Sequence, residues 1–150
     1  MKNSMTFLII FLGVMTAMAP LSTDMYLPSL PEISANFGIS TSMTQLTLTM
    51  TMIGMSFGQI LGGPVADRLG RKIPLFMGMV GFTIASLVCA VTENIYLFLG
   101  FRFVQGLSGA FGIVIARAVA RDVVDGPALM RFMAILMMVN GLAPIAAPVA

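Results

Sequence analysis

The stretch Gly63-Pro64-Val65-Ala66-Asp67-Arg68-Leu69-Gly70-Arg71-Lys72 stands between two long apolar segments and decides how the chain folds. Its two glycines, Gly63 and Gly70, permit a tight reversal of the backbone. Its basic side chains are of the kind that membrane proteins retain on the cytoplasmic side. The stretch therefore predicts two antiparallel transmembrane helices joined by a cytoplasmic link.

The composition of the whole chain also indicates a membrane protein. Hydrophobic residues make up 58% of the 150 residues, charged residues make up 9%, and the mean hydropathy is +0.99. Soluble domains carry about a quarter charged residues. The 8 basic and 6 acidic side chains present here are too few to cover a soluble surface of this size. A soluble globular protein is therefore excluded.

Few residues could carry catalysis or hold a cofactor. The chain has no histidine and a single cysteine, Cys89, which lies inside an apolar run. We therefore expect no disulfide, no metal site and no cofactor. No nucleophile and base stand together in the sequence, so an enzyme is not expected. The net charge of +2 gives no reason to expect a nucleic acid partner.

Apolar stretches long enough to cross a membrane recur along the chain. A bilayer core of about 30 Å requires roughly 20 apolar residues in a helix. The predicted fold class is an all-α, polytopic membrane protein. Its five transmembrane helices are expected at about 5–28, 42–66, 73–91, 95–118 and 131–150.

Local signals support these helices. Ser42-Met43-Thr44-Gln45 has the pattern of a capping box at the start of the second span. Pro74 and Pro127 stand where a first helical turn accepts proline. Pro20 lies inside the first span, where it should bend the helix.

The basic residues predict the orientation of the spans. If the N-terminus is cytoplasmic, seven of the eight basic residues fall at cytoplasmic ends, and the eighth, Arg102, lies within a span. The predicted outer loops contain Glu32 and Glu93 but neither lysine nor arginine. This distribution obeys the positive-inside rule, so we expect the N-terminus in the cytoplasm.

The opening stretch resembles the signature loop of the major facilitator superfamily, G-x-x-x-D-[RK]-x-G-[RK]-[RK]. The matching residues are Gly63, Asp67, Arg68, Gly70, Arg71 and Lys72. Asp67 could bind a guanidinium or a helix N-terminus, which would make the link a breakable clasp between two conformations. Arg117, Arg121 and Asp122 stand at the inner end of the fourth span and could pair with the loop. The alternative is an ordinary cytoplasmic loop that obeys the positive-inside rule and contains a turn glycine.

A second motif lies at the outer end of the first span, Asp24-Met25-Tyr26-Leu27-Pro28-Ser29-Leu30-Pro31. It is similar to the bicyclomycin-resistance (Bcr/CflA) family of drug:proton antiporters, a branch of the superfamily. A carboxylate about one turn inside a span is costly and suggests a function. The alternative is a helix that ends early and leaves Asp24 solvated.

A third motif, Arg102-Phe103-Val104-Gln105-Gly106, resembles the R-x-x-x-G motif of the superfamily's fourth helix. The resemblance implies a role in proton transfer. Arg102 and Asp24 lie at comparable depths from the outer side, so Arg102 could stabilise the ionised Asp24 when close and release it when apart. The alternative is that Arg102 extends to the outer interface.

The last span carries an incomplete motif. Asn140 to Pro148 resembles the fifth-helix antiporter motif, with Ala143-Pro144 in place of its usual Gly-Pro pair. Its small and helix-bending residues are Gly141, Ala143, Pro144 and Pro148. The alternative is a merely kinked helix.

Two further patterns lie in the second span. Gly54, Gly58 and Gly62 form a ladder of small residues at four-residue spacing, which predicts close helix packing. On the same helix, Thr44, Thr47 and Thr51 share one face. Their hydroxyls could line a polar cavity or could return to backbone carbonyls one turn earlier.

The resemblance implies proton-driven export of small, chemically varied compounds by alternating access, across a bacterial inner membrane. The expected partners are the lipid bilayer, a drug-like substrate and protons. Family members carry about twelve helices in two halves, so residues 1–150 are expected to form a partial N-terminal bundle. We expect this chain alone, without the C-terminal helices, not to transport. A metabolite uniporter or symporter of the same superfamily and a non-transporting membrane fragment remain as alternatives.

Overall fold

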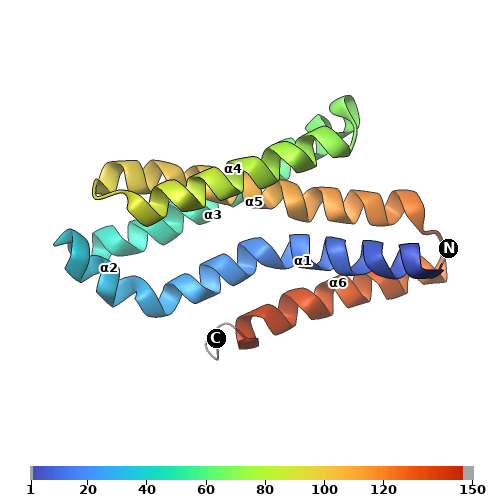
Figure 1. The fold of residues 1–150 in the computed structure, drawn as a ribbon, viewed down its shortest axis with the longest axis horizontal. Coiled ribbons are helices and arrows are strands. Elements are labelled where there is room, and N and C mark those ends of the chain that lie inside the picture. Colours follow the sequence, from blue (N-terminus) through green and yellow to red (C-terminus); the bar gives the residue numbers. More distant parts are fainter. Residues whose placement is uncertain (1, 147–150) are drawn as a thin grey trace.

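The computed structural model describes residues 2–146, which form seven helical segments without a strand. The predicted all-α fold class is confirmed (Figure 1). The elements are α1 (Lys2–Tyr26), the 3-10 helix η1 (Leu27–Ser29), α2 (Leu30–Phe37), α3 (Thr41–Leu69), α4 (Lys72–Val91), α5 (Ile95–Val123) and α6 (Pro127–Ala146).

Five long helices, α1, α3, α4, α5 and α6, overlap the five segments predicted from the sequence. Three stretches are long and apolar enough to cross a membrane, Thr6–Phe37, Lys72–Val91 and Ile95–Val123, and Pro127–Leu142 is a shorter apolar helix. The helix α3 has 29 residues, as α5 does, but its threonines, glycines and glutamines lower its hydropathy. Large apolar side chains such as Ile60 and Phe76 are about 70% exposed on the bundle surface, where lipid would cover them. The chain is a multi-pass membrane protein.

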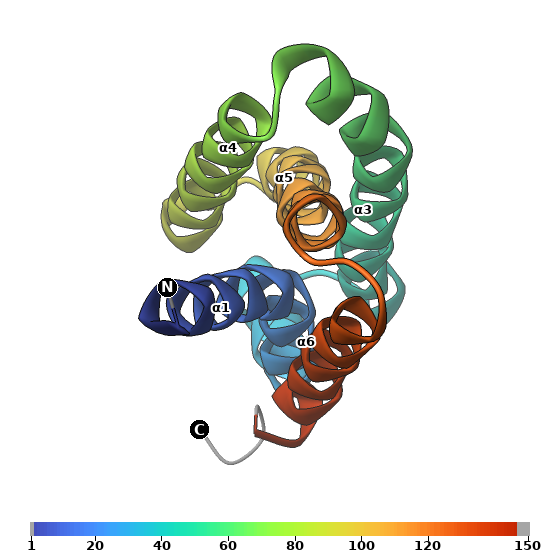
Figure 2. The same cartoon turned by 90° about the vertical axis from the view of Figure 1, so that its right-hand side faces the viewer.

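The helix α5 lies at the centre of the bundle. Figure 2 shows α5 between α3 and α4, with α1 and α6 side by side beneath them. One apolar core joins α1, α5 and α6 through Leu12, Ala116, Ala120, Val124, Phe132 and Leu136. Because α5 contacts every other long helix, its side chains are placed to form a site between helices.

Glycines bring the backbones of α3 and α5 into direct contact. A Cβ atom on Gly54 would lie 2.1 Å from the carbonyl oxygen of Phe103, and one on Gly58 would lie 2.4 Å from that of Leu107. The contact is reciprocal, since a Cβ atom on Gly106 would lie 2.0 Å from the carbonyl oxygen of Thr51. The close packing that the glycine ladder predicts is confirmed.

The cytoplasmic link between α3 and α4 is shorter than the sequence suggested. The helix α3 continues to Leu69 and includes Pro64, so most of the predicted loop is helical. Gly70 adopts a φ of 78°, which favours glycine, and α4 begins at Lys72. The expectation that two glycines make the reversal is corrected: Gly63 is helical, and Gly70 alone provides the left-handed backbone.

The start of α3 also differs from the prediction. The helix begins at Thr41, and its N-cap is Ser40, whose Oγ accepts a hydrogen bond from the backbone N–H of Met43 at 3.3 Å. Ser42, the expected first residue of the capping box, therefore lies inside the helix. The serine two residues earlier has the extended backbone that an N-cap requires.

The short helix α2 was not expected, because its residues lie between the first two predicted spans, in a predicted outer loop. Pro31 stands in its first turn, where the missing N–H does no harm, and Glu32 is in the same turn. Gly38, with a φ of 60°, ends the helix. Figure 1 also shows α1 bent along its length, as Pro20 inside the helix predicts.

Candidate functional site

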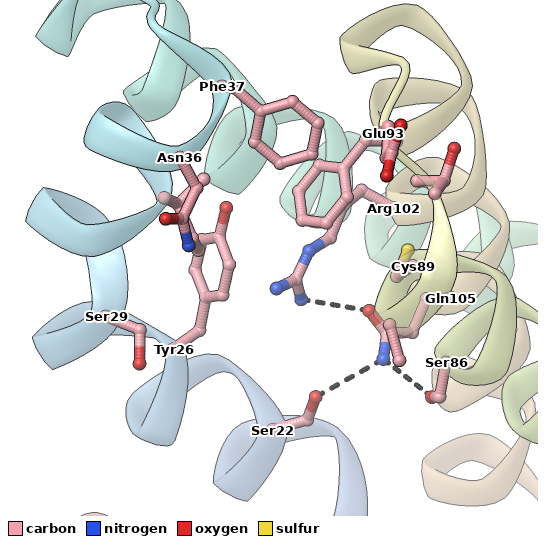
Figure 3. Close-up of a pocket in the computed structure, with 14 residues that line it drawn as sticks. Ser22, Tyr26, Ser29, Asn36, Phe37, Ser86, Cys89, Glu93, Arg102 and Gln105 are labelled. Carbon is pink, nitrogen blue, oxygen red and sulfur yellow. Dashed lines mark hydrogen bonds between the residues drawn. The ribbon is translucent and has the colours of Figure 1, made fainter.

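A cavity of about 850 Å³ opens between α1, α2, α4 and α5. It lies at the end of the bundle that the positive-inside rule places outside the cell. Side chains from α1, α2, α4 and α5 line it together (Figure 3). These include Ser22, Tyr26, Asn36, Phe37, Ser86, Cys89, Glu93, Phe98, Arg102 and Gln105.

Arg102 is the buried charged residue among those that line this cavity. Its side chain is only 7% exposed, and its guanidinium lies over the ring of Tyr26, 3.6 Å from the ring centroid. The Nη1 group donates a hydrogen bond to Oε1 of Gln105 at 2.9 Å, whereas Nε is buried without a partner in the described part of the chain. Arg102 therefore stays inside the bundle and does not extend to the outer interface.

Gln105 connects three helices at the base of the cavity. Its Oε1 accepts from Arg102, and its Nε2 donates to Oγ of Ser86 at 2.8 Å and to Oγ of Ser22 at 3.5 Å. Figure 3 shows these hydrogen bonds running from α5 to α4 and to α1. Because Arg102 and Gln105 are three residues apart on one helix, they share a face. That spacing could have predicted their contact, but no sequence signal indicated Ser22 or Ser86.

Replacing Gln105 by leucine should destabilise the bundle. The change leaves the buried Nη1 of Arg102 without its acceptor, at a cost of about 2 kcal/mol or more. It also removes the hydrogen bonds to the hydroxyls of Ser22 and Ser86, although Ser86 still donates to the carbonyl oxygen of Phe82. We expect a lower thermal unfolding midpoint in detergent. The matched control is Gln59→Leu on the exposed side of α3, which should shift stability by about 0.5 kcal/mol at most. Equal midpoints for both variants would contradict a structural role for the Gln105 network.

Asp24 lies inside the helix α1, which continues past it to Tyr26. The side chain is half-buried and makes no hydrogen bond or ion pair with any residue between 2 and 146. It does not line the cavity, and the ring of Tyr26 covers the guanidinium of Arg102 instead. The structure therefore does not bring Asp24 and Arg102 together, and their coupling stays a prediction.

The three threonines of α3 are buried and return their hydroxyls to backbone carbonyls. Thr44 donates to the carbonyl oxygen of Ser40 at 3.1 Å, and Thr51 donates to that of Thr47 at 3.2 Å. Thr47 bonds to the carbonyl oxygen of Thr44 and pairs with the hydroxyl of Tyr26. Thr44 also borders a hollow of about 290 Å³ beside α2. Of the two alternatives, these hydroxyls therefore follow hydrogen bonding to backbone carbonyls one turn earlier. A role of the threonines in lining the transport cavity stays a prediction.

At the opposite end of the bundle, charges link the α3–α4 turn to α5. Arg71 donates from Nη1 to Oδ1 of Asp67 and from Nε to Oδ2 of Asp122, both at 2.9 Å. The hydrogen bond that Arg71 donates to Asp122 is the main cause that raises the pKa of Arg71. Within residues 2–146, Arg68 and Arg121 form no ion pair. Exposed pairs of this kind contribute little to stability, so the value of the contact would lie in being made and broken.

The motif of the last span is only partly visible. Gly141 is exposed, and a Cβ atom there would meet nothing within 4 Å. The helix α6 continues through Ala143 and Pro144 to Ala146, and Pro148 lies outside the described residues.

Comparisons with known proteins agree with these motifs. The family model described as Major Facilitator Superfamily matches residues 12–150. Over 91% of its length, the chain is 42% identical to "Uncharacterized MFS-type transporter YdgK" of Bacillus subtilis, of which it covers 34%. It is 35% identical to "Bicyclomycin resistance protein homolog" of Haemophilus influenzae, over 99% of the chain and 37% of the relative. It is also 35% identical to "Multidrug resistance protein MdtL" of Escherichia coli, over 87% of the chain and 33% of the relative. The chain thus spans about a third of the length of these relatives.

Proposed function

Because the chain belongs to the major facilitator superfamily, we propose that the protein containing it is a secondary transporter that exchanges protons for small, chemically varied compounds. The compounds would leave the cell across a bacterial inner membrane by alternating access. The observation that carries this proposal is the cavity between membrane helices that contains the buried Arg102. Ionisable side chains inside membrane spans are costly and commonly mark substrate or proton pathways.

Asp24 and Arg102 are the residues proposed for proton coupling. Asp24 would take up a proton from the outer side, because it is half-buried near that end of α1 and forms no ion pair with a cation among residues 2–146. The two side chains are unpaired in this structure, so in the proposed cycle they would approach each other in a different conformation. A transporter that alternates between two states can make such a contact in one state only.

The ion pairs that Arg71 forms with Asp67 and Asp122 are proposed to form and break in the same cycle, at the cytoplasmic end of the bundle. These ion pairs hold the α3–α4 turn against α5. In the proposed cycle this contact stabilises the state that is closed toward the cytoplasm and breaks when the other state forms. The names of two relatives, which refer to bicyclomycin resistance and multidrug resistance, support drugs as substrates.

One observation favours a second candidate, a metabolite uniporter or symporter. Coupling through Asp24 and Arg102 needs their interaction, and within the described residues no ion pair joins them. A uniporter would need no such pair. A symporter would move protons and substrate in the same direction, and this difference in direction separates the candidates.

The test is substrate-dependent proton movement in everted membrane vesicles that contain the full chain encoded by the gene. Respiration acidifies the vesicle lumen, and bicyclomycin or another antibiotic is then added outside. Antiport should raise the luminal pH, symport should lower it further, and uniport should leave it unchanged. Vesicles without the protein are the control. Absence of any substrate-dependent transport would support the non-transporting alternative.

A further inference from the structure

We propose that the cavity around Arg102 binds compounds that combine a carboxylate with an aromatic or apolar body, and that Arg102 contacts the ligand's carboxylate directly. The inference rests on the proposed function and names the substrate class of that site. It adds a direct ligand contact to the coupling role proposed for Arg102.

The cavity contains a buried positive charge, Arg102, that no described side chain neutralises in an ion pair. Arg102 is 7% exposed, and both ion pairs within residues 2–146 belong to Arg71 at the other end of the bundle. Glu93 also lines the cavity but is exposed and forms neither of those pairs. A buried cation without an anion is strongly disfavoured. A ligand carboxylate would supply an anion that the described residues do not provide, whereas a cationic ligand would add to the unfavourable charge.

Two contacts fix the orientation of the Arg102 guanidinium in the cavity. The ring of Tyr26 covers one face, and the hydrogen bond to Gln105 holds Nη1. Nε has no partner in the part of the chain that the structure describes. In Figure 3 the guanidinium points into the space between Tyr26, Ser22 and Gln105. A planar guanidinium held in this orientation binds a carboxylate more favourably than it binds a neutral apolar group.

Aromatic side chains form part of the cavity wall. Phe37 of α2 and Phe98 of α5 face each other with ring centroids 5.4 Å apart, and Tyr26 stacks near Phe98. A volume of about 850 Å³ is of the size that holds drug-sized ligands. Aromatic walls favour a flat apolar body over a sugar-like polyol.

The experiment compares two probes with the same ring system and opposite charges, indoleacetate and tryptamine. Binding is measured by isothermal titration calorimetry on the purified full chain in detergent at neutral pH. We expect indoleacetate to bind at least about tenfold more tightly, as a charge-assisted hydrogen bond to arginine allows. Tighter or equal binding of tryptamine overturns the proposal, and so does the absence of indoleacetate binding at millimolar concentration.

Two variants test whether Arg102 causes the preference. Arg102→Gln should abolish it. Gln105→Glu keeps Arg102 and places a carboxylate against it, so it should also weaken indoleacetate binding, and it keeps the proposal testable if the first variant does not fold. The control is Arg131→Gln at the exposed start of α6, which should bind as wild type does. A preference for indoleacetate that survives in Gln105→Glu, or in a folded Arg102→Gln protein, overturns the proposal.

Equilibrium binding needs no transport, so this experiment and the vesicle test can fail separately. A protein that prefers indoleacetate but moves no protons would retain the inferred site and lose the proposed antiport. A protein that exchanges protons for drugs but prefers tryptamine would retain the antiport and lose the inferred ligand class.

Discussion

Gly106→Ala should separate α5 from α3 and lower the free energy of unfolding by about 4 kcal/mol or more, the upper range for a single substitution. A methyl group at this position would lie 2.0 Å from the carbonyl oxygen of Thr51 and 3.0 Å from the backbone nitrogen of Met55. Both atoms belong to the backbone of a helix, so no rotamer change can relieve the overlap. The helices would have to move apart, and contacts along the whole α3–α5 interface would weaken.

The measurement is thermal unfolding in detergent, together with the yield of monodisperse protein. Gly54→Ala should behave in the same way, because its Cβ would lie 2.1 Å from the carbonyl oxygen of Phe103. The matched controls are Gly100→Ala on α5 and Gly63→Ala on α3, where a Cβ atom meets nothing within 4 Å. Each control should be neutral or stabilising by up to about 1 kcal/mol, since alanine favours the helix. Similar losses in all four variants would contradict the steric explanation.

The contact between α3 and α5 was partly predictable from the sequence. Gly54, Gly58 and Gly62 repeat every four residues, and such a repeat has few purposes in a membrane helix other than close packing. The partner surface was not predictable in the same way. Gly106 belongs to a motif associated with proton transfer, and only the structure shows that its missing side chain admits the backbone of α3.

The surroundings of Arg102 illustrate a limit of sequence reasoning. Residue counting placed Asp24 and Arg102 at similar depths, but depth does not determine how each helix is rotated about its axis. Tyr26 stands two residues after Asp24 on α1, about 200° further around the helix axis, and it is Tyr26 that lies over the guanidinium. The partner on the same helix, Gln105, follows from local spacing alone. Contacts within one helix were therefore easier to predict from the sequence than contacts between helices.

The segment between α1 and α3 was missed for a different reason. A proline-containing stretch between two predicted spans favours a loop on average, yet Pro31 stands in a first helical turn and Gly38 ends the helix. The outcome matters for the site, because Asn36 and Phe37 of α2 line the cavity. An apparent connecting loop therefore contributes a wall of the candidate site.

Asp24→Asn should reduce proton-coupled export to the level of cells that lack the protein. The substitution removes the only carboxyl group of α1 among the residues whose side chains are described, and it preserves the size of the side chain. Asp24 makes no hydrogen bond or ion pair with the described residues, so the free energy of unfolding should change by no more than about 0.5 kcal/mol. Loss of export with unchanged stability would therefore identify a role in the transport cycle.

Two further measurements separate proton coupling from substrate binding. Exchange of labelled substrate across the membrane requires no net proton movement, so Asp24→Asn should retain exchange while losing export driven by a pH gradient. Asp24→Glu keeps a carboxylate and should retain part of the gradient-driven export. The matched control is Glu32→Gln, an exposed acidic residue in the first turn of α2, which should export as wild type does. Gradient-driven export that persists in Asp24→Asn would assign proton coupling to another group. Wild-type export that proved independent of the pH gradient would instead strengthen the uniporter alternative.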